Sequence, residues 1–233
     1  HRDLHSFPTR RSSDLNNSID KVKAIEINEM AASILNSGKR LQRLTENILF
    51  YSQLLTYIDK PDKISEMNSF SLHNSKEIIL ESVNILGEQY NRQNDFILNI
   101  ENSFLQMSDY YFYKLMYELI DNALKFSQSN SLVEISAIKI DNQYLITIID
   151  KGRGISKEQV DGIGAYIQFE RYLHEQQGAG LGLIITKMLS IMHNGTFEII
   201  SEINQGTTVK INLPIPCKEC LNFFSEELNK VAI

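Results

Sequence analysis

The 233-residue chain has no tryptophan and only two cysteines and four prolines. Its two thiols, in the run Cys217-Lys-Glu-Cys220, supply at most half of a tetrahedral zinc site, so we interpret them as reduced thiols, with a redox role or a shared metal site as the alternative. No uninterrupted apolar run approaches the ~18 residues that span a bilayer, which predicts no membrane contact within this stretch. A formal net charge of −6 disfavours a nucleic-acid-binding surface.

Residues 1–15 resemble the translation of a common short-read sequencing adapter, and we exclude them from the reasoning about the fold. Their opening His1-Arg-Asp-Leu4 also resembles the catalytic loop of Ser/Thr/Tyr protein kinases. That interpretation fails because Pro8 stands where this loop needs asparagine, and because no strand or glycine-rich loop precedes it. We therefore expect these residues to be non-native and the native protein to continue upstream.

A seven-residue apolar repeat runs through residues 16–60, which contain no proline. Apolar side chains recur at every seventh position from Ile27 to Leu55, and a second series is offset by three residues. The pattern predicts a long, bundle-forming helix whose apolar seam needs a partner helix, either upstream or from a second subunit. Pro61 ends this helix and begins a linker over residues 61–68.

Helical and strand-like patterns alternate across residues 69–216. Helices are predicted at 74–93, from Ser108 past Glu118, and at 183–192, with Asn74 and Glu77 as a capping box and Ser108 as a second cap. Strands are predicted at 70–72, 95–101, 132–140, 143–149, 196–202 and 207–213. Because helices and antiparallel strands segregate, the fold class is α+β, a two-layer sandwich preceded by the long helix. Residues 217–233 form a C-terminal tail.

A polar row on the second of these helices is the first candidate for chemistry. Glu118, Asn122 and Lys125 fall at i, i+4 and i+7, so a carboxylate, an amide and an ammonium share one face. A solvated helix face is the alternative reading for Glu118 and Lys125. The asparagine between them favours a ligand-binding face.

Two glycine-rich clusters follow. Asp150 ends an apolar strand and is followed by Gly152 and Gly154, glycines that let a ligand approach the backbone. The run Gly178-Ala-Gly180-Leu181-Gly182-Leu183 opens a helix whose first N–H groups and positive dipole end suit phosphate oxygens. With the polar row, these clusters predict a nucleotide site.

In this order the clusters resemble the N box and the two glycine boxes of the ATP-binding catalytic region of sensor histidine kinases, members of the GHKL ATPase superfamily. Phe169-Glu-Arg-Tyr172 resembles the F box, and Gly206-Thr207-Thr208 resembles the terminal Gly-Thr strand. The resemblance extends roughly from Ser69 to Pro214. Each element alone is common in proteins, whereas five in the right order are specific.

The resemblance implies a role for each residue. Asp150 would accept a hydrogen bond from the exocyclic amine of adenine, and Asn122 would bind Mg²⁺ through its amide oxygen. Lys125 would face the phosphates, and Glu118 would orient or deprotonate the accepting group. The other implied nucleotide contacts are Gly152, Gly154, Phe169, Gly178, Gly180, Leu181, Gly182 and Thr207. A core role for Phe169 and a strand-forming role for Thr207 stay open.

The resemblance further implies the catalytic part of a two-component histidine kinase that uses ATP and Mg²⁺. It would form a homodimer through the helix of residues 16–60 and serve a response-regulator receiver domain. None of the five histidines stands mid-helix with an acidic neighbour and a downstream proline, so we expect the phosphoacceptor histidine to lie outside this chain. We expect the chain in the cytoplasm, with an upstream membrane anchor as an option for the whole protein.

Two alternatives remain at this point. One is a related Ser/Thr kinase or hydrolysing ATPase, which the 23 residues between Gly154 and Gly178 disfavour because hydrolysing relatives tend to have longer lids. The other is a non-enzymatic dimerisation module gated by ATP, which the intact boxes disfavour.

Overall fold

The computed structural model describes residues 10–58, 60, 62–64, 74–164 and 180–216. The chain divides into two units, residues 1–46 and 47–233. Among the described helices, none combines the length and the apolar composition needed to cross a lipid bilayer. The predicted strand at 70–72 and the tail at 217–233 lie outside the described residues.

The predicted long helix is α1, Arg10–Tyr57, which begins inside the segment that resembles an adapter. In the first unit its apolar repeat is exposed: Ile27, Ile34 and Leu41 are 64, 73 and 65% accessible. In the second unit the same helix is packed, and Phe50 and Leu54 are 6 and 0% accessible. These two buried residues are not positions of the seven-residue repeat, whose Leu55 stays 41% accessible, so the helix packs against the core mainly through other residues.

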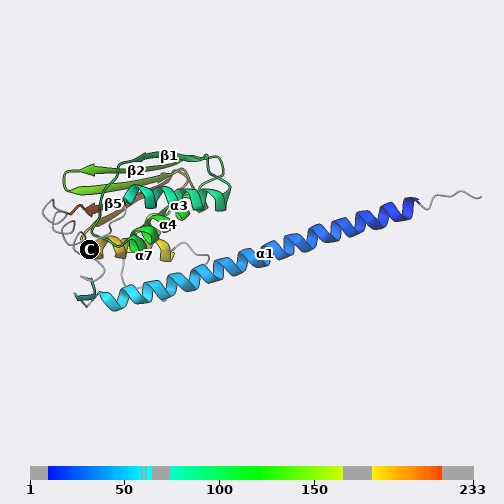
Figure 1. The fold of residues 1–233 in the computed structure, drawn as a ribbon, viewed down its shortest axis with the longest axis horizontal. Coiled ribbons are helices and arrows are strands. Elements are labelled where there is room, and N and C mark those ends of the chain that lie inside the picture. Colours follow the sequence, from blue (N-terminus) through cyan, green and yellow to red (C-terminus); the bar gives the residue numbers. More distant parts are fainter. Residues whose placement is uncertain (1–9, 59, 61, 65–73, 165–179, 217–233) are drawn as a thin grey trace, which may run out of the picture. The chain divides into compact units, whose positions relative to one another are not determined.

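The second unit contains a five-stranded sheet of order β1-β2-β3-β5-β4, with helices α3, α4 and α7 on one face (Figure 1). The strands are β1 Phe96–Ile100, β2 Val133–Ile140, β3 Gln143–Asp150, β4 Thr196–Glu202 and β5 Gly206–Pro214. The helices are α3 Ser75–Tyr90, α4 Asp109–Phe126, α5 Lys157–Gly164 and α7 Gly180–Met192. The predicted α+β sandwich is confirmed.

The sheet is mixed, because one of its strand pairs is parallel. β1 pairs with β2 in parallel, whereas the other three pairs are antiparallel. A parallel pair needs a crossover connection, and α4 supplies it between β1 and β2. The two antiparallel hairpins predicted from the sequence are confirmed, whereas no partner was predicted for β1.

Most predicted boundaries lie within a few residues of the observed ones. α3 ends at Tyr90 rather than near Gln93, because Asn91 adopts a left-handed conformation with φ 54°. Asn74 caps this helix by accepting a hydrogen bond from the Lys76 N–H at 3.2 Å. Ser108 occupies the cap position of α4, but its side chain makes no capping hydrogen bond, so that part of the prediction was wrong.

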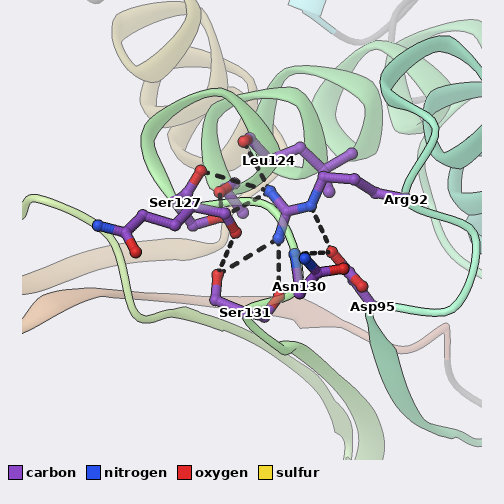
Figure 2. A network of polar contacts seen from close by, with 8 residues as sticks. Arg92, Asp95, Leu124, Ser127, Asn130 and Ser131 are labelled. Carbon is purple, nitrogen blue, oxygen red and sulfur yellow. Dashed lines mark hydrogen bonds and ion pairs between the residues drawn. The ribbon is translucent and has the colours of Figure 1, made fainter.

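The buried guanidinium of Arg92 joins the end of α3 to the end of α4 (Figure 2). Its Nε donates to Asp95 Oδ2 at 2.6 Å, and its Nη1 donates to the Leu124 carbonyl and to Ser127 Oγ, both at 2.9 Å. Its Nη2 donates to the Ser131 carbonyl at 2.7 Å. One side chain thus pairs with the Leu124 carbonyl in the last turn of α4 and with the loop that follows, and it holds the C-terminal end of α4 in place.

Candidate functional site

The polar row on α4 lies directly beside the start of α7. A side chain at Gly182 would overlap Glu118 Oε2, and its Cβ would lie 3.4 Å from Asn122 Nδ2. Glu118 is only 1% accessible, whereas Lys125 at the end of the helix is exposed. The fold therefore brings the first and third sequence clusters together, and only glycine leaves room where they meet.

The Asn122 side chain has the features expected of a ligand group. Its Nδ2 is buried and has no hydrogen-bond partner within the described part of the chain. A buried amide N–H without a protein partner fits a position where a ligand oxygen, such as one of a phosphate, accepts from it, and this leaves the amide oxygen for a metal ion. The described residues contain no group of three or more His, Cys, Asp or Glu side chains that would hold a metal by themselves. A Mg²⁺ ion here would therefore take phosphate oxygens as further ligands, as Mg²⁺ commonly does.

Asp150 ends β3 and is 8% accessible. Its Oδ1 accepts a hydrogen bond from the Gly152 N–H at 2.8 Å. Burial raises the pKa of Asp150 above its ordinary value, and hydrogen bonds from the backbone of Gly152 and Thr207 partly oppose this shift. A buried carboxylate with a perturbed pKa at a strand end is typical of a functional group.

The loop after β3 is tied to the end of α4. The Arg153 N–H donates to the Phe126 carbonyl at 3.1 Å, and the Arg153 guanidinium lies 4.4 Å from the centre of the Phe126 ring. A side chain at Gly152 would overlap the same Phe126 carbonyl. Lys125, the neighbour of Phe126, places its Nζ 5.0 Å from that ring. α4 is therefore in contact with both glycine clusters, one near each end of its polar row.

Thr207 lies next to Asp150, with which it pairs in the β3–β5 register. Its Oγ1 is 2.9 Å from Ser201 Oγ, which also accepts from the Ile155 N–H at 2.9 Å and donates to the Gly206 carbonyl at 2.8 Å. Ser201 was not predicted, and the sequence offers no signal for it beyond its place in a hairpin strand. It joins the loop after Asp150 to the β4–β5 hairpin.

The remaining predicted contacts fall in two groups. Gly180 and Leu181 lie in the first turn of α7, which begins three residues before the predicted Leu183. Gly154 has φ +66°, and a side chain there would overlap the Glu202 carbonyl. Phe169 and Gly178 lie outside the described residues.

Two residues that the sequence reasoning missed contact Glu118. The Lys114 Nζ lies 2.9 Å and the Asn47 Nδ2 3.3 Å from Glu118 Oε1, and Lys114 also donates to Asn47 Oδ1 at 2.6 Å. Lys114 stands four residues before Glu118 on the same helix face, a spacing that predicts an ion pair. Asn47 is 71 residues away in the sequence and carries no comparable signal.

Comparison with known proteins relates the chain to a family of ATPases. Residues 110–216 match the family described as histidine kinase-, DNA gyrase B-, and HSP90-like ATPase. Sensor protein SrrB of Staphylococcus aureus is 27% identical over 206 residues, covering 82% of this chain and 32% of the relative. The chain thus spans about a third of the length of the curated relatives it matches.

Solved structures show the same fold. The mycobacterial sensor histidine kinase MprB superimposes with a TM-score of 0.53 at 23% identity, covering 61% of this chain and 95% of that chain. The histidine kinase AdeS of Acinetobacter baumannii gives a TM-score of 0.58 at 19% identity, covering 79% and 83%. The family match over residues 110–216 and the sensor-kinase relatives together support an ATP-binding catalytic domain of the histidine kinase type, within the GHKL ATPase superfamily, for this part of the chain.

Proposed function

We propose that the chain binds Mg-ATP along α4, between the end of β3 and the start of α7, and transfers the γ-phosphate to a histidine that lies outside the chain. The supporting observation is that α4 contacts both glycine clusters. Glu118 and Asn122 adjoin Gly182, while Phe126 adjoins Gly152 in the loop that follows Asp150. A ligand that spans these contacts has an adenine at Asp150 and phosphates near α7.

Each side chain has a role in this proposal. The buried Asp150 carboxylate accepts a hydrogen bond from the adenine amine, and Thr207, its partner in the β3–β5 pairing, is a second contact of the nucleotide. Asn122 offers its amide oxygen to Mg²⁺, which would neutralise charge on the phosphates when bound. Lys125 adds a positive charge near the phosphates, and Glu118 orients or deprotonates the attacking group. The first N–H groups of α7 face the phosphate oxygens.

The partners follow from the long helix and from the relatives. The exposed apolar repeat at Ile27, Ile34 and Leu41 favours burial against a partner helix, so we propose a homodimer through α1. Since the relatives are sensor kinases, the phosphate would pass from the histidine to an aspartate of a response-regulator receiver domain. A cytoplasmic location of this domain fits that exchange.

Titration of a fluorescent ATP analogue tests the site. Asp150→Asn and Asn122→Ala are each expected to weaken binding about tenfold or more, because each removes a buried polar contact to the ligand. Asp141→Asn and Asn84→Ala change the same residue types on exposed surfaces and are expected to bind like the wild type. Equal affinity for the analogue in all five proteins would contradict the proposed site. The chain is also expected to gain no acid-labile phosphate, since the acceptor lies elsewhere.

A further inference from the structure

The two oxygens of the Glu118 carboxylate face different neighbours. Oε1 lies 2.9 Å from the Lys114 Nζ and 3.3 Å from the Asn47 Nδ2. Oε2 is the atom that a side chain at Gly182 would overlap, so it faces the start of α7. The carboxylate therefore has one oxygen engaged by the protein on the α1 side and the other directed toward the proposed phosphate site.

Lys114 and Asn47 also hold each other. The Lys114 ammonium donates to Asn47 Oδ1 at 2.6 Å as well as to Glu118, and its side chain is only 18% accessible. It lies 5.7 Å from the centre of the Phe50 ring, one helical turn beyond Asn47 on α1. The three polar side chains thus form a closed set of hydrogen bonds at a buried position, where such bonds restrict rotation most.

We propose that Lys114 and Asn47 are positioning residues that orient Glu118 for the reaction, and that Asn47 makes this orientation depend on α1. The inference rests on the proposed function, in which Glu118 acts on the attacking group. With Oε1 held by two donors, Oε2 is kept toward the nucleotide, and small errors in such placement slow a reaction strongly. A movement of α1 that withdraws Asn47 removes one donor and leaves Lys114 alone to hold the carboxylate.

The test separates binding from turnover in the full chain. Lys114→Met removes the ammonium and keeps a side chain of similar length, and Asn47→Ala removes the amide. Lys114→Arg keeps a positive charge at this position. Affinity for the fluorescent ATP analogue is expected to stay within about twofold of wild type, since neither residue is among the proposed ligand contacts. With water in place of the missing histidine as the acceptor, phosphate release from Mg-ATP in a single turnover is expected to fall about tenfold in Lys114→Met and less in Asn47→Ala. Lys114→Arg is expected to keep most of the rate. Lys76→Met and Asn84→Ala on the exposed face of α3 serve as controls.

A second measurement is independent of turnover. If Lys114 and Glu118 interact, the melting-temperature losses of Lys114→Met and Glu118→Gln will sum to more than the loss of the double variant. Strict additivity would overturn the proposal. So would an unchanged rate in Lys114→Met, or a parallel fall in rate and affinity. Failure of the proposed function is distinct, because the wild type would then not bind the analogue, or Asp150→Asn would bind it equally well.

Discussion

Gly182→Ala is the sharpest test of how closely α7 approaches Glu118. Gly182 is the third residue of α7, where alanine stabilises a helix by up to about 1 kcal/mol relative to glycine. Here the added methyl group would overlap Glu118 Oε2. The end of a glutamate side chain usually moves away from such an overlap, but Glu118 is 1% accessible and its Oε1 is held by Lys114 and Asn47.

The expected change in the free energy of unfolding is the balance between the gain in helix propensity and the cost of this overlap. Overpacking of a well-filled site costs about 1–3 kcal/mol, so the helix-propensity gain is cancelled or exceeded and the net change is about 0–2 kcal/mol of destabilisation. In a Glu118→Asp background the carboxylate is one methylene shorter, and the overlap is relieved. Gly182→Ala is then expected to stabilise by about 1 kcal/mol. The coupling between the two substitutions should therefore reach about 1–3 kcal/mol.

Urea unfolding of the four proteins measures this coupling. Far-ultraviolet circular dichroism is suitable because the chain has no tryptophan for fluorescence. Gly38→Ala is the matched control: it lies in the middle of α1, where an added Cβ meets nothing within 4 Å, and its effect should add to that of Glu118→Asp. A coupling below about 0.5 kcal/mol for Gly182→Ala would refute the close approach.

Three further outcomes are expected. Because burial raises the pKa of Asp150, the folded state favours the protonated carboxyl. The free energy of unfolding of the wild type relative to Asp150→Asn should therefore fall as the pH rises above the ordinary pKa of 3.8. Urea unfolding at several pH values measures this difference, and an opposite slope would contradict the prediction. Arg92→Met leaves the buried Asp95 carboxylate without its cation and should cost about 3–5 kcal/mol in the same assay, whereas Lys76→Met on exposed α3 should cost little. Gly206→Ala places a side chain at φ +99° against the Asp150 carbonyl. The free energy of unfolding should fall by at least about 1 kcal/mol, and binding of the ATP analogue should weaken. An unchanged melting temperature and affinity in calorimetry would count against this prediction.

The sequence alone determined the elements and most of the chemical groups. A helical spacing placed Glu118 and Asn122 on one face, because side chains four residues apart lie one turn apart on any helix. Alternating apolar residues predicted β3 and its hairpin with β2, because a sheet with one buried face needs that period. These are local properties, which depend on residues that are near one another in the chain.

Only the tertiary structure decided which groups meet. The parallel pairing of β1 depends on the α4 crossover, and the contact of Gly182 with Glu118 depends on how α4 and α7 pack. Asn47 reaches Glu118 across 71 positions. No local pattern encodes such contacts, because they arise when apolar faces far apart in sequence are buried together and bring polar side chains with them.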